Sequence, residues 1–163
     1  MRIPIIPALV VASTILLAGC TAEAPTPSRE VVAQAGTNKM GSGELRTDLA
    51  PLATRFEDLA DAESARWSSG SLGGDDRVPG PSTSWIDAVV VLPQASYDAL
   101  RAAHEYAESA EAPSVADALA ASVPAGPLLV SSDLDQRFAL SEGSSDVYLD
   151  DATHSLVISS RFQ

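Results

Sequence analysis

Apolar residues recur at a helical spacing in the first regular part of the chain. They follow one another at steps of four, three, four and three residues, and they are Leu45, Leu49, Leu52, Phe56 and Leu59. Such steps line one face of an α-helix, so we predict a helix over residues 49–64. Asp48 is placed to cap the first turn, and Pro51 falls inside that turn, where proline is tolerated.

The strongest strand pattern runs from Trp85 to Leu92. It is apolar at every position except Asp87, which is typical of a central strand that is buried on both faces. The preceding residues 64–68 predict a weaker strand. Residues 68–84 contain four glycines and two prolines, and we interpret them as a long loop.

Two further helices are predicted in the middle of the chain. The first follows Pro93 and runs to about residue 108, and its apolar face holds Tyr97, Leu100, His104 and Ala107. The second opens at Ser114, because Ser114 and Asp117 have the spacing of a capping box. Its inward positions are Val115, Leu119 and Val123.

The last part of the chain predicts short strands around one short helix. Residues 128–130 form a brief apolar run, which indicates a buried strand. Ser132 and Asp135 repeat the capping-box spacing at the start of a helix of one or two turns. Residues 146–150 and 155–162 are apolar runs joined by turn-forming residues, which predicts a hairpin.

Together these patterns predict an α+β fold for residues 44–163. We expect one domain with a small antiparallel sheet of four or five short strands. Two to four helices would pack on that sheet, two or three of them together on one face. A chain of this length fits one domain and a tail.

The N-terminal segment has the pattern of an export signal. A single Arg2 precedes an apolar run from Ile3 to Ala18, which is shorter than the roughly 20 residues of a membrane-spanning helix. The run ends in Leu17-Ala18-Gly19-Cys20, which resembles the lipobox of bacterial lipoproteins. That resemblance implies that residues 1–19 are removed and that the Cys20 thiol receives a diacylglyceryl group. An uncleaved anchor, or an ordinary signal peptide with a chance cysteine, is the alternative interpretation.

This resemblance predicts a protein held by lipid at the extracytoplasmic face of the cell membrane. Two acyl chains are enough for stable anchoring. Residues 20–43 mix Pro, Ala, Ser, Thr and Gly without helical or strand periodicity, so we interpret them as a tether. A flexible chain of that length has a root-mean-square reach of about 25–30 Å.

The charge of the chain narrows the range of partners. Residues 44–163 hold 7 basic against 20 acidic side chains, a net charge near −13. Such a surface repels nucleic-acid phosphates and anionic lipid headgroups, so we exclude nucleic acid as a partner. Lipidation would consume the only cysteine, which leaves no thiol for a disulfide, a thiolate metal site or a nucleophile. No cofactor is predicted.

Several side chains are candidate ligands. Asp75 and Asp76 could contribute to a calcium site, although two carboxylates fall short of the six to eight oxygens that calcium takes. Asp87 is the carboxylate whose neighbours predict burial, and a structural role is the commoner outcome for such a residue.

The two histidines suggest a further set of candidates. His104 and Glu108 resemble the ends of the zinc motif H-E-x-x-H with its second histidine replaced, and His154 is the only other imidazole. Asp150, Asp151, His154 and Ser155 contain the ingredients of a hydrolytic triad, which is defined by geometry and not by sequence order.

Three functions follow in order of preference. The first is a non-catalytic lipoprotein that binds an envelope protein partner. The second is a lipoprotein that binds a divalent cation or a small ligand, and the third is a cell-envelope hydrolase that uses Asp87, His154 or another carboxylate.

Overall fold

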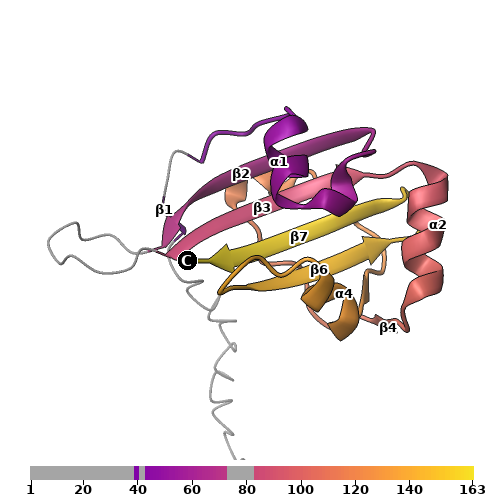
Figure 1. Ribbon diagram of the computed structural model, residues 1–163. Helices are drawn as coiled ribbons and strands as arrows, with labels where there is room; N and C mark the ends of the chain where they lie inside the picture. The colour runs from indigo at the N-terminus through magenta and orange to yellow at the C-terminus, as the bar shows by residue number, and fades with distance from the viewer. Residues whose placement is uncertain (1–38, 41–42, 73–82) are drawn as a thin grey trace, which may run out of the picture. The chain divides into compact units, whose positions relative to one another are not determined.

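Four long strands form the centre of the sheet in the computed structural model, which describes residues 39–40, 43–72 and 83–163. They are β2 (Ser64–Leu72), β3 (Thr83–Val91), β6 (Ser144–Asp150) and β7 (Ser155–Phe162). Two-residue strands extend the sheet at its edges, and they are β1 (Lys39–Met40), β4 (Ala107–Glu108) and β5 (Leu129–Val130). Within the described residues the strand order is β1-β2-β3-β7-β6-β5-β4, and all neighbours are antiparallel (Figure 1).

The α+β class predicted from the sequence is confirmed, but the sheet is larger than expected. The described residues form seven strands instead of four or five. One added strand is β4, in residues 107–108, where the sequence predicts the end of a helix. The other is β1, because residues 39–40, assigned to the tether by composition, pair with the end of β2. In addition, β2 continues to Leu72, through residues whose serine and glycine content predicts a loop.

The alternation of side chains along the strands gives the sheet two different faces. Ala88 of β3 pairs with Trp67 of β2 and with Ile158 of β7, and all three belong to the main apolar core. Asp87 and Val89 point to the other face because successive strand residues alternate. Register therefore decides which side chains enter each layer.

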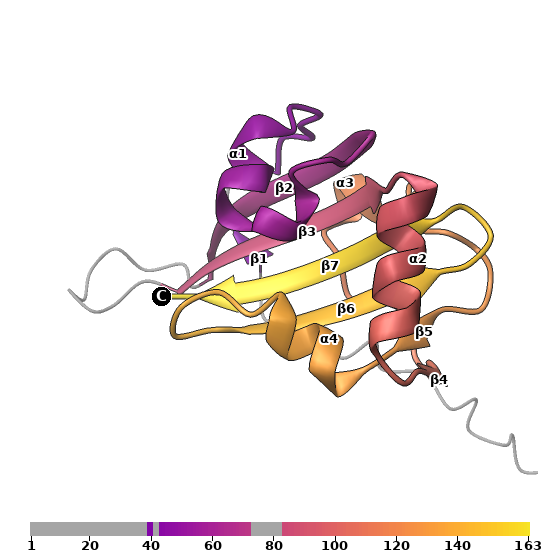
Figure 2. The same ribbon diagram turned by 45° about the vertical axis from the view of Figure 1, so that its right-hand side comes forward.

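Three α-helices cover the face that carries the main core. They are α1 (Ala50–Arg55), α2 (Gln94–Ala103) and α4 (Ser132–Arg137), and a 3-10 turn, η1 (Glu57–Leu59), follows α1. Their buried leucines join the same cluster as Ala88 and Ile158. Figure 2 shows these helices in front of the sheet and α3 (Asp117–Ala120) behind it.

The prediction that the helices share one face is therefore wrong for α3. Leu119 of α3 is fully buried against Val89 and Val157, with Val115 and Val123 packed around them. Because β3 and β7 are apolar on both faces at this point, the second face also needs cover. The inward positions predicted for this segment are therefore confirmed. At its centre the sheet is covered by helices on both faces.

The first helix is shorter than its spacing predicts. Helix α1 ends at Arg55, and Phe56 has extended backbone angles before η1 begins. Phe56 and Leu59 remain buried as expected, and the Phe56 ring lies 5.9 Å from that of Phe138. Pro51 lies in the first turn as predicted, but the cap position is Leu49, without a side-chain hydrogen bond from Asp48.

The other predicted helix bounds also change. Helix α2 ends at Ala103, because His104 adopts an extended conformation, and residues 107–108 form β4. The two predicted capping boxes do not form, since neither α3 nor α4 has a side-chain cap hydrogen bond. The hairpin of β6 and β7 is confirmed. In the part of the chain that the structure describes, no helix has the length and apolar character needed to cross a bilayer.

Candidate functional site

Asp87 is buried, as its neighbours predict, and it forms an ion pair with Lys39. Its side chain is fully buried, and Lys39 Nζ donates to both of its carboxylate oxygens, at 2.8 and 2.6 Å. The backbone N–H of Ala116 donates a further hydrogen bond of 2.7 Å. All three contacts hold the buried carboxylate in place. Asp87 is thus engaged in linking β1, β3 and the segment before α3.

Lys39 is the other half of this arrangement, and sequence reasoning passed over it. Its ammonium also donates to the carbonyl of Ser114 at 2.8 Å and lies 5.6 Å from the ring centre of Trp85. Ser159 of β7 donates to the same carbonyl at 3.2 Å. One signal was available in the sequence, because Lys39 is the only lysine of the chain. Burying a charged carboxylate is costly unless a cation or hydrogen-bond donors pair with it, so a buried aspartate indicates a partner elsewhere in the chain.

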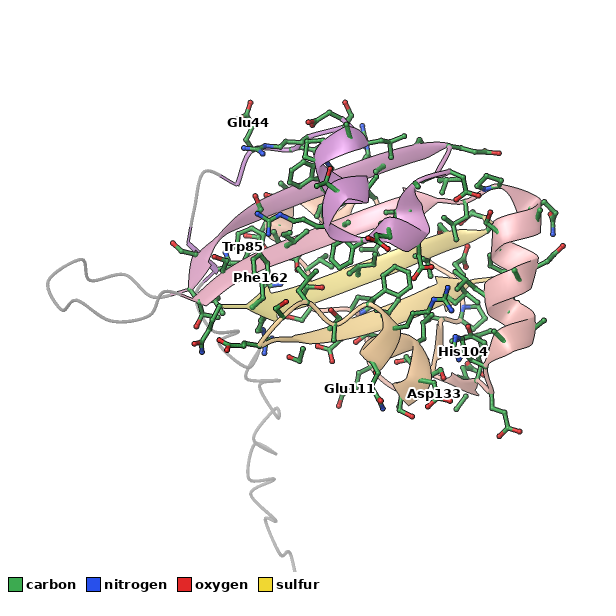
Figure 3. All side chains as sticks on the ribbon, in the orientation of Figure 1. Glu44, Trp85, His104, Glu111, Asp133 and Phe162 are labelled. Carbon is green, nitrogen blue, oxygen red and sulfur yellow. The ribbon has the colours of Figure 1, made fainter. Side chains whose placement is uncertain are left out.

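The candidate pair His104 and Glu108 loses its helical spacing. His104 follows the last residue of α2, and Glu108 is an exposed residue of β4. Figure 3 shows His104 at the C-terminal end of α2. Its ring meets that of Tyr106 edge-on, 6.3 Å between centres, and its buried Nε2 has no hydrogen-bond partner within the described residues.

His154 lies near the opposite end of α2. Its ring centre is 4.7 Å from that of Tyr97, and Tyr97 precedes His104 by seven residues. At a rise of 1.5 Å per residue, seven helical residues span about 10 Å. The structure therefore does not bring His104 and His154 together. Among the described residues no group of three or more His, Cys, Asp or Glu side chains could hold a metal ion.

The residues that could form a hydrolytic triad make other contacts, which hold the β6–β7 turn. Asp150 accepts hydrogen bonds from the backbone N–H and the hydroxyl of Thr153, at 2.8 and 2.5 Å. The Thr153 hydroxyl also bonds to that of Ser155, at 2.8 Å. Asp151 accepts from Tyr97 and Arg101. These contacts fix the β6–β7 turn, in which His154 itself adopts a positive φ of 51°.

Three of the candidate residues predicted from the sequence lie outside the described residues. They are Cys20, Asp75 and Asp76. The described part of the predicted loop 68–84 is strand, since residues 68–72 belong to β2 and residues 83–84 to β3.

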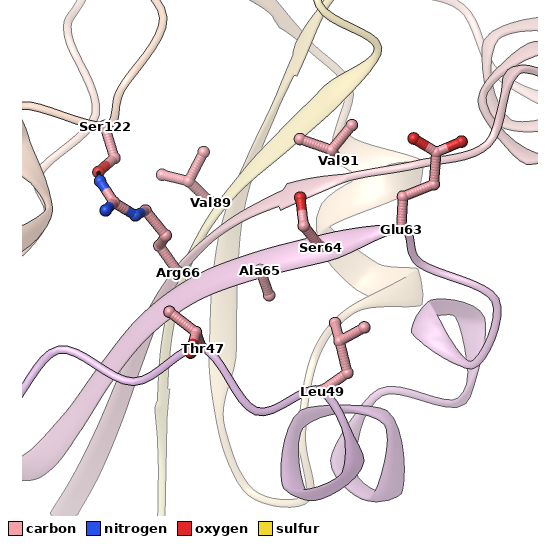
Figure 4. A pocket seen from close by; sticks show the side chains of 9 residues that line it. All are labelled: Thr47, Leu49, Glu63, Ser64, Ala65, Arg66, Val89, Val91 and Ser122. Atoms are coloured by element: carbon pink, nitrogen blue, oxygen red, sulfur yellow. Dashed lines mark hydrogen bonds between the residues drawn. The ribbon is translucent and has the colours of Figure 1, made fainter.

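A groove at the outer part of β2 and β3 is the concave site that the sequence did not indicate. Its volume is about 470 Å³, within the usual range for ligand sites of roughly 300–1,000 Å³. Val89 and Val91 line it on the face of the sheet that carries α3, and Ser122 follows the end of that helix. Leu49 and Ala65, which also line it, pack with the main core. Figure 4 shows the side chains around it. They are Thr47, Leu49, Glu63, Ser64, Ala65, Arg66, Val89, Val91 and Ser122.

Charge is distributed unevenly along this groove. Arg66 lies at one end and donates to the Ser122 hydroxyl at 3.3 Å. Glu63 lies at the other end, and Val89, Val91 and Ser64 lie between them (Figure 4). The groove offers one cation, one anion and an aliphatic floor. It contains neither histidine nor a pair of carboxylates, so its side chains suit binding better than acid–base chemistry.

One further carboxylate, that of Asp135, has a raised pKa. Burial raises the pKa of Asp135 in α4, the nearby Asp146 adds to that rise, and the bond from the Val147 N–H opposes it. Asp135 also lines a second cavity of about 540 Å³ between α4 and the β4–β5 edge. Its 2.8 Å bond to Val147 ties α4 to β6, which is a structural use of the carboxylate.

Comparison with known protein families, curated proteins and solved structures finds no match for this chain, so its function has to be argued from its own residues.

Proposed function

We propose that this protein is an exported lipoprotein that acts as a non-catalytic binding module. The lipobox-like Leu17–Cys20 supports attachment through lipid on Cys20, at the extracytoplasmic face of the cell membrane. The tether after it would hold the folded residues away from the bilayer. An envelope protein is the partner class that we favour.

One observation carries the choice of binding over catalysis. Both oxygens of the buried Asp87 and Oδ2 of the buried Asp150 accept structural hydrogen bonds, whereas the groove is lined by aliphatic and small polar side chains with one charge at each end. Catalytic acids and bases must be free to exchange protons with a substrate. A binding groove needs only shape, apolar area and a few placed polar groups.

A small-ligand-binding lipoprotein is the second candidate. The opposite charges of Arg66 and Glu63 at the ends of the groove favour it. The divalent-cation form of this candidate depends on Asp75 and Asp76, outside the described residues. A melting temperature that rises in millimolar calcium or zinc would support that form, and an unchanged one would remove it.

The anchor is tested by comparing the wild type with Cys20→Ser in cell fractions. We expect the wild type in the membrane fraction, labelled by a fatty-acid analogue, and the variant without label. Equal labelling of both proteins would exclude Cys20 as the lipid site. The absence of catalysis is tested by incubating the purified full chain with cell-wall and glycan substrates, where any turnover that survives dilution of contaminants would support the envelope hydrolase instead.

A further inference from the structure

We propose that the β2–β3 groove binds a short peptide of about three residues through both of its free termini. This inference rests on the proposed binding function and names a ligand class for it. The peptide carboxylate would lie at Arg66 and Ser122, the terminal ammonium at Glu63, and an apolar side chain on Val89 and Val91.

Arg66 is suited to the carboxylate because its charge is not used by the fold. Within the described residues, the ion pairs belong to Lys39, Arg101 and Arg137. Among the residues that the structure describes, the Arg66 guanidinium makes one hydrogen bond, to the Ser122 hydroxyl. A guanidinium carries five N–H donors and pairs with carboxylates in a two-pronged geometry. The chain is strongly acidic overall. An arginine that forms no ion pair among the described residues, at a concave site, therefore favours an anionic group on the ligand.

Glu63 provides the matching anion at a suitable distance. It is exposed, and its backbone N–H is fixed by a 2.9 Å bond to the carbonyl of Val91. It lies three positions before Arg66, which corresponds to about 10 Å along an extended chain. A fully extended tripeptide spans about the same length. A ligand with opposite charges at its two ends therefore fits the groove in one direction.

The floor between the two charges is aliphatic. Val89 is packed against α3, whereas Val91 remains partly exposed. Both project from β3 to the same face, since they are two residues apart. Leu49 adds a third aliphatic side chain to the wall. An apolar side chain in the middle of the ligand would cover this surface, and its burial favours binding.

The test uses the full chain purified in detergent and the peptide Ala-Val-Ala as probe. Calorimetry compares the free peptide with its N-acetylated and C-amidated forms, and methyl NMR follows Val89 and Val91. We expect each cap to weaken binding about tenfold, because a hydrogen-bonded charge is lost, and the free peptide to shift both valine signals.

Charge-removing variants assign each terminus to one residue. Arg66→Gln should bind free and amidated peptide equally while still discriminating against acetylation, and Glu63→Gln should do the reverse. Arg55→Gln and Glu57→Gln, exposed on α1 and η1, are matched controls that should bind like the wild type. No binding at millimolar peptide, equal binding of all three peptide forms, or equal weakening by the control variants would overturn the inference.

These results separate the inference from the proposed function. A protein partner captured in cells through the groove, without any peptide binding, would overturn the peptide ligand and leave the binding module in place. Peptide binding without a captured protein would support both the ligand class and the binding function.

Discussion

Lys39 Nζ lies 2.6 Å from Oδ2 of Asp87, so the only lysine of the chain closes an ion pair with a fully buried carboxylate 48 positions away. This contact joins the edge strand β1 to the interior of the sheet.

Removal of Lys39 should therefore destabilise the protein strongly. We expect Lys39→Met to cost about 3 kcal/mol in the free energy of unfolding, because it leaves an uncompensated buried charge. The double variant Lys39→Met/Asp87→Asn should recover most of this loss, since Asn can still accept from the Ala116 N–H. Urea unfolding provides the measurement.

The matched control is the exposed ion pair of Arg137 with Asp58, whose side chains are 45% and 33% exposed. Arg137→Met should cost less than about 1 kcal/mol. An equal loss of stability in Lys39→Met and Arg137→Met would contradict a larger contribution from the buried Lys39–Asp87 pair.

The same pair should protect Lys39 from chemical modification. The Lys39 side chain is 14% exposed, and its ammonium donates to three acceptor groups, so an acylating reagent should reach its nitrogen slowly. We expect slow acylation in buffer, fast acylation in urea, and an intermediate rate in Asp87→Asn. Peptide mass spectrometry reads the single lysine directly. A rate in buffer as fast as that in urea would contradict the pairing.

The raised pKa of Asp135 predicts a pH dependence of stability. Because burial raises this pKa above its ordinary value of 3.8, the folded protein retains a proton that the unfolded chain releases. Stability from this group therefore falls as the pH rises from about 4 through the raised pKa. Asp135→Asn should flatten the melting temperature across that window and match or exceed the wild type at pH 7.

Thermal melting between about pH 3.5 and 7 measures this effect. The control is Asp133→Asn, an exposed residue of the same helix, which should keep the wild-type slope. A slope that is unchanged in Asp135→Asn would show that the protonation of Asp135 does not differ between the folded and unfolded chains.

Gly143 should tolerate no side chain, because a Cβ there would collide with the carbonyl of Arg161 and the backbone of Phe162. These are backbone atoms of the central strand β7, which cannot move aside cheaply. We expect Gly143→Ala to cost about 2 kcal/mol, whereas Gly126→Ala, whose Cβ meets only Asp150 at 3.4 Å, should stay near wild type. Equal melting temperatures would contradict the close approach.

The parts of the fold that sequence predicts well are those with strong local patterns. The apolar run of β3 and the β6–β7 hairpin lie where expected, because burial and turn residues agree there. Strand β2 was missed beyond Ser68 because serine and glycine have low strand propensity. Its nine-residue pairing with β3 overrides that local preference.

The site was harder to predict than the fold. Burial of Asp87 followed from its neighbours, but Lys39 comes from a segment whose composition indicates a tether, and only pairing across the sheet brings them together. Arg66 and Glu63 meet the β3 valines through register, which sequence alone does not reveal. The predicted pairing of His104 with Glu108 required a helix that continues beyond Ala103, and α2 ends there.

The most direct test of a binding module is photo-crosslinking in intact cells from a residue at the groove. A photoreactive amino acid at Thr47, which is exposed and lines the groove, is compared with one at Ala102, which is exposed on α2. The account predicts one reproducible adduct from position 47 that is absent from position 102. No adduct at position 47 with either a protein or a short peptide, or the same adducts from both positions, would contradict it.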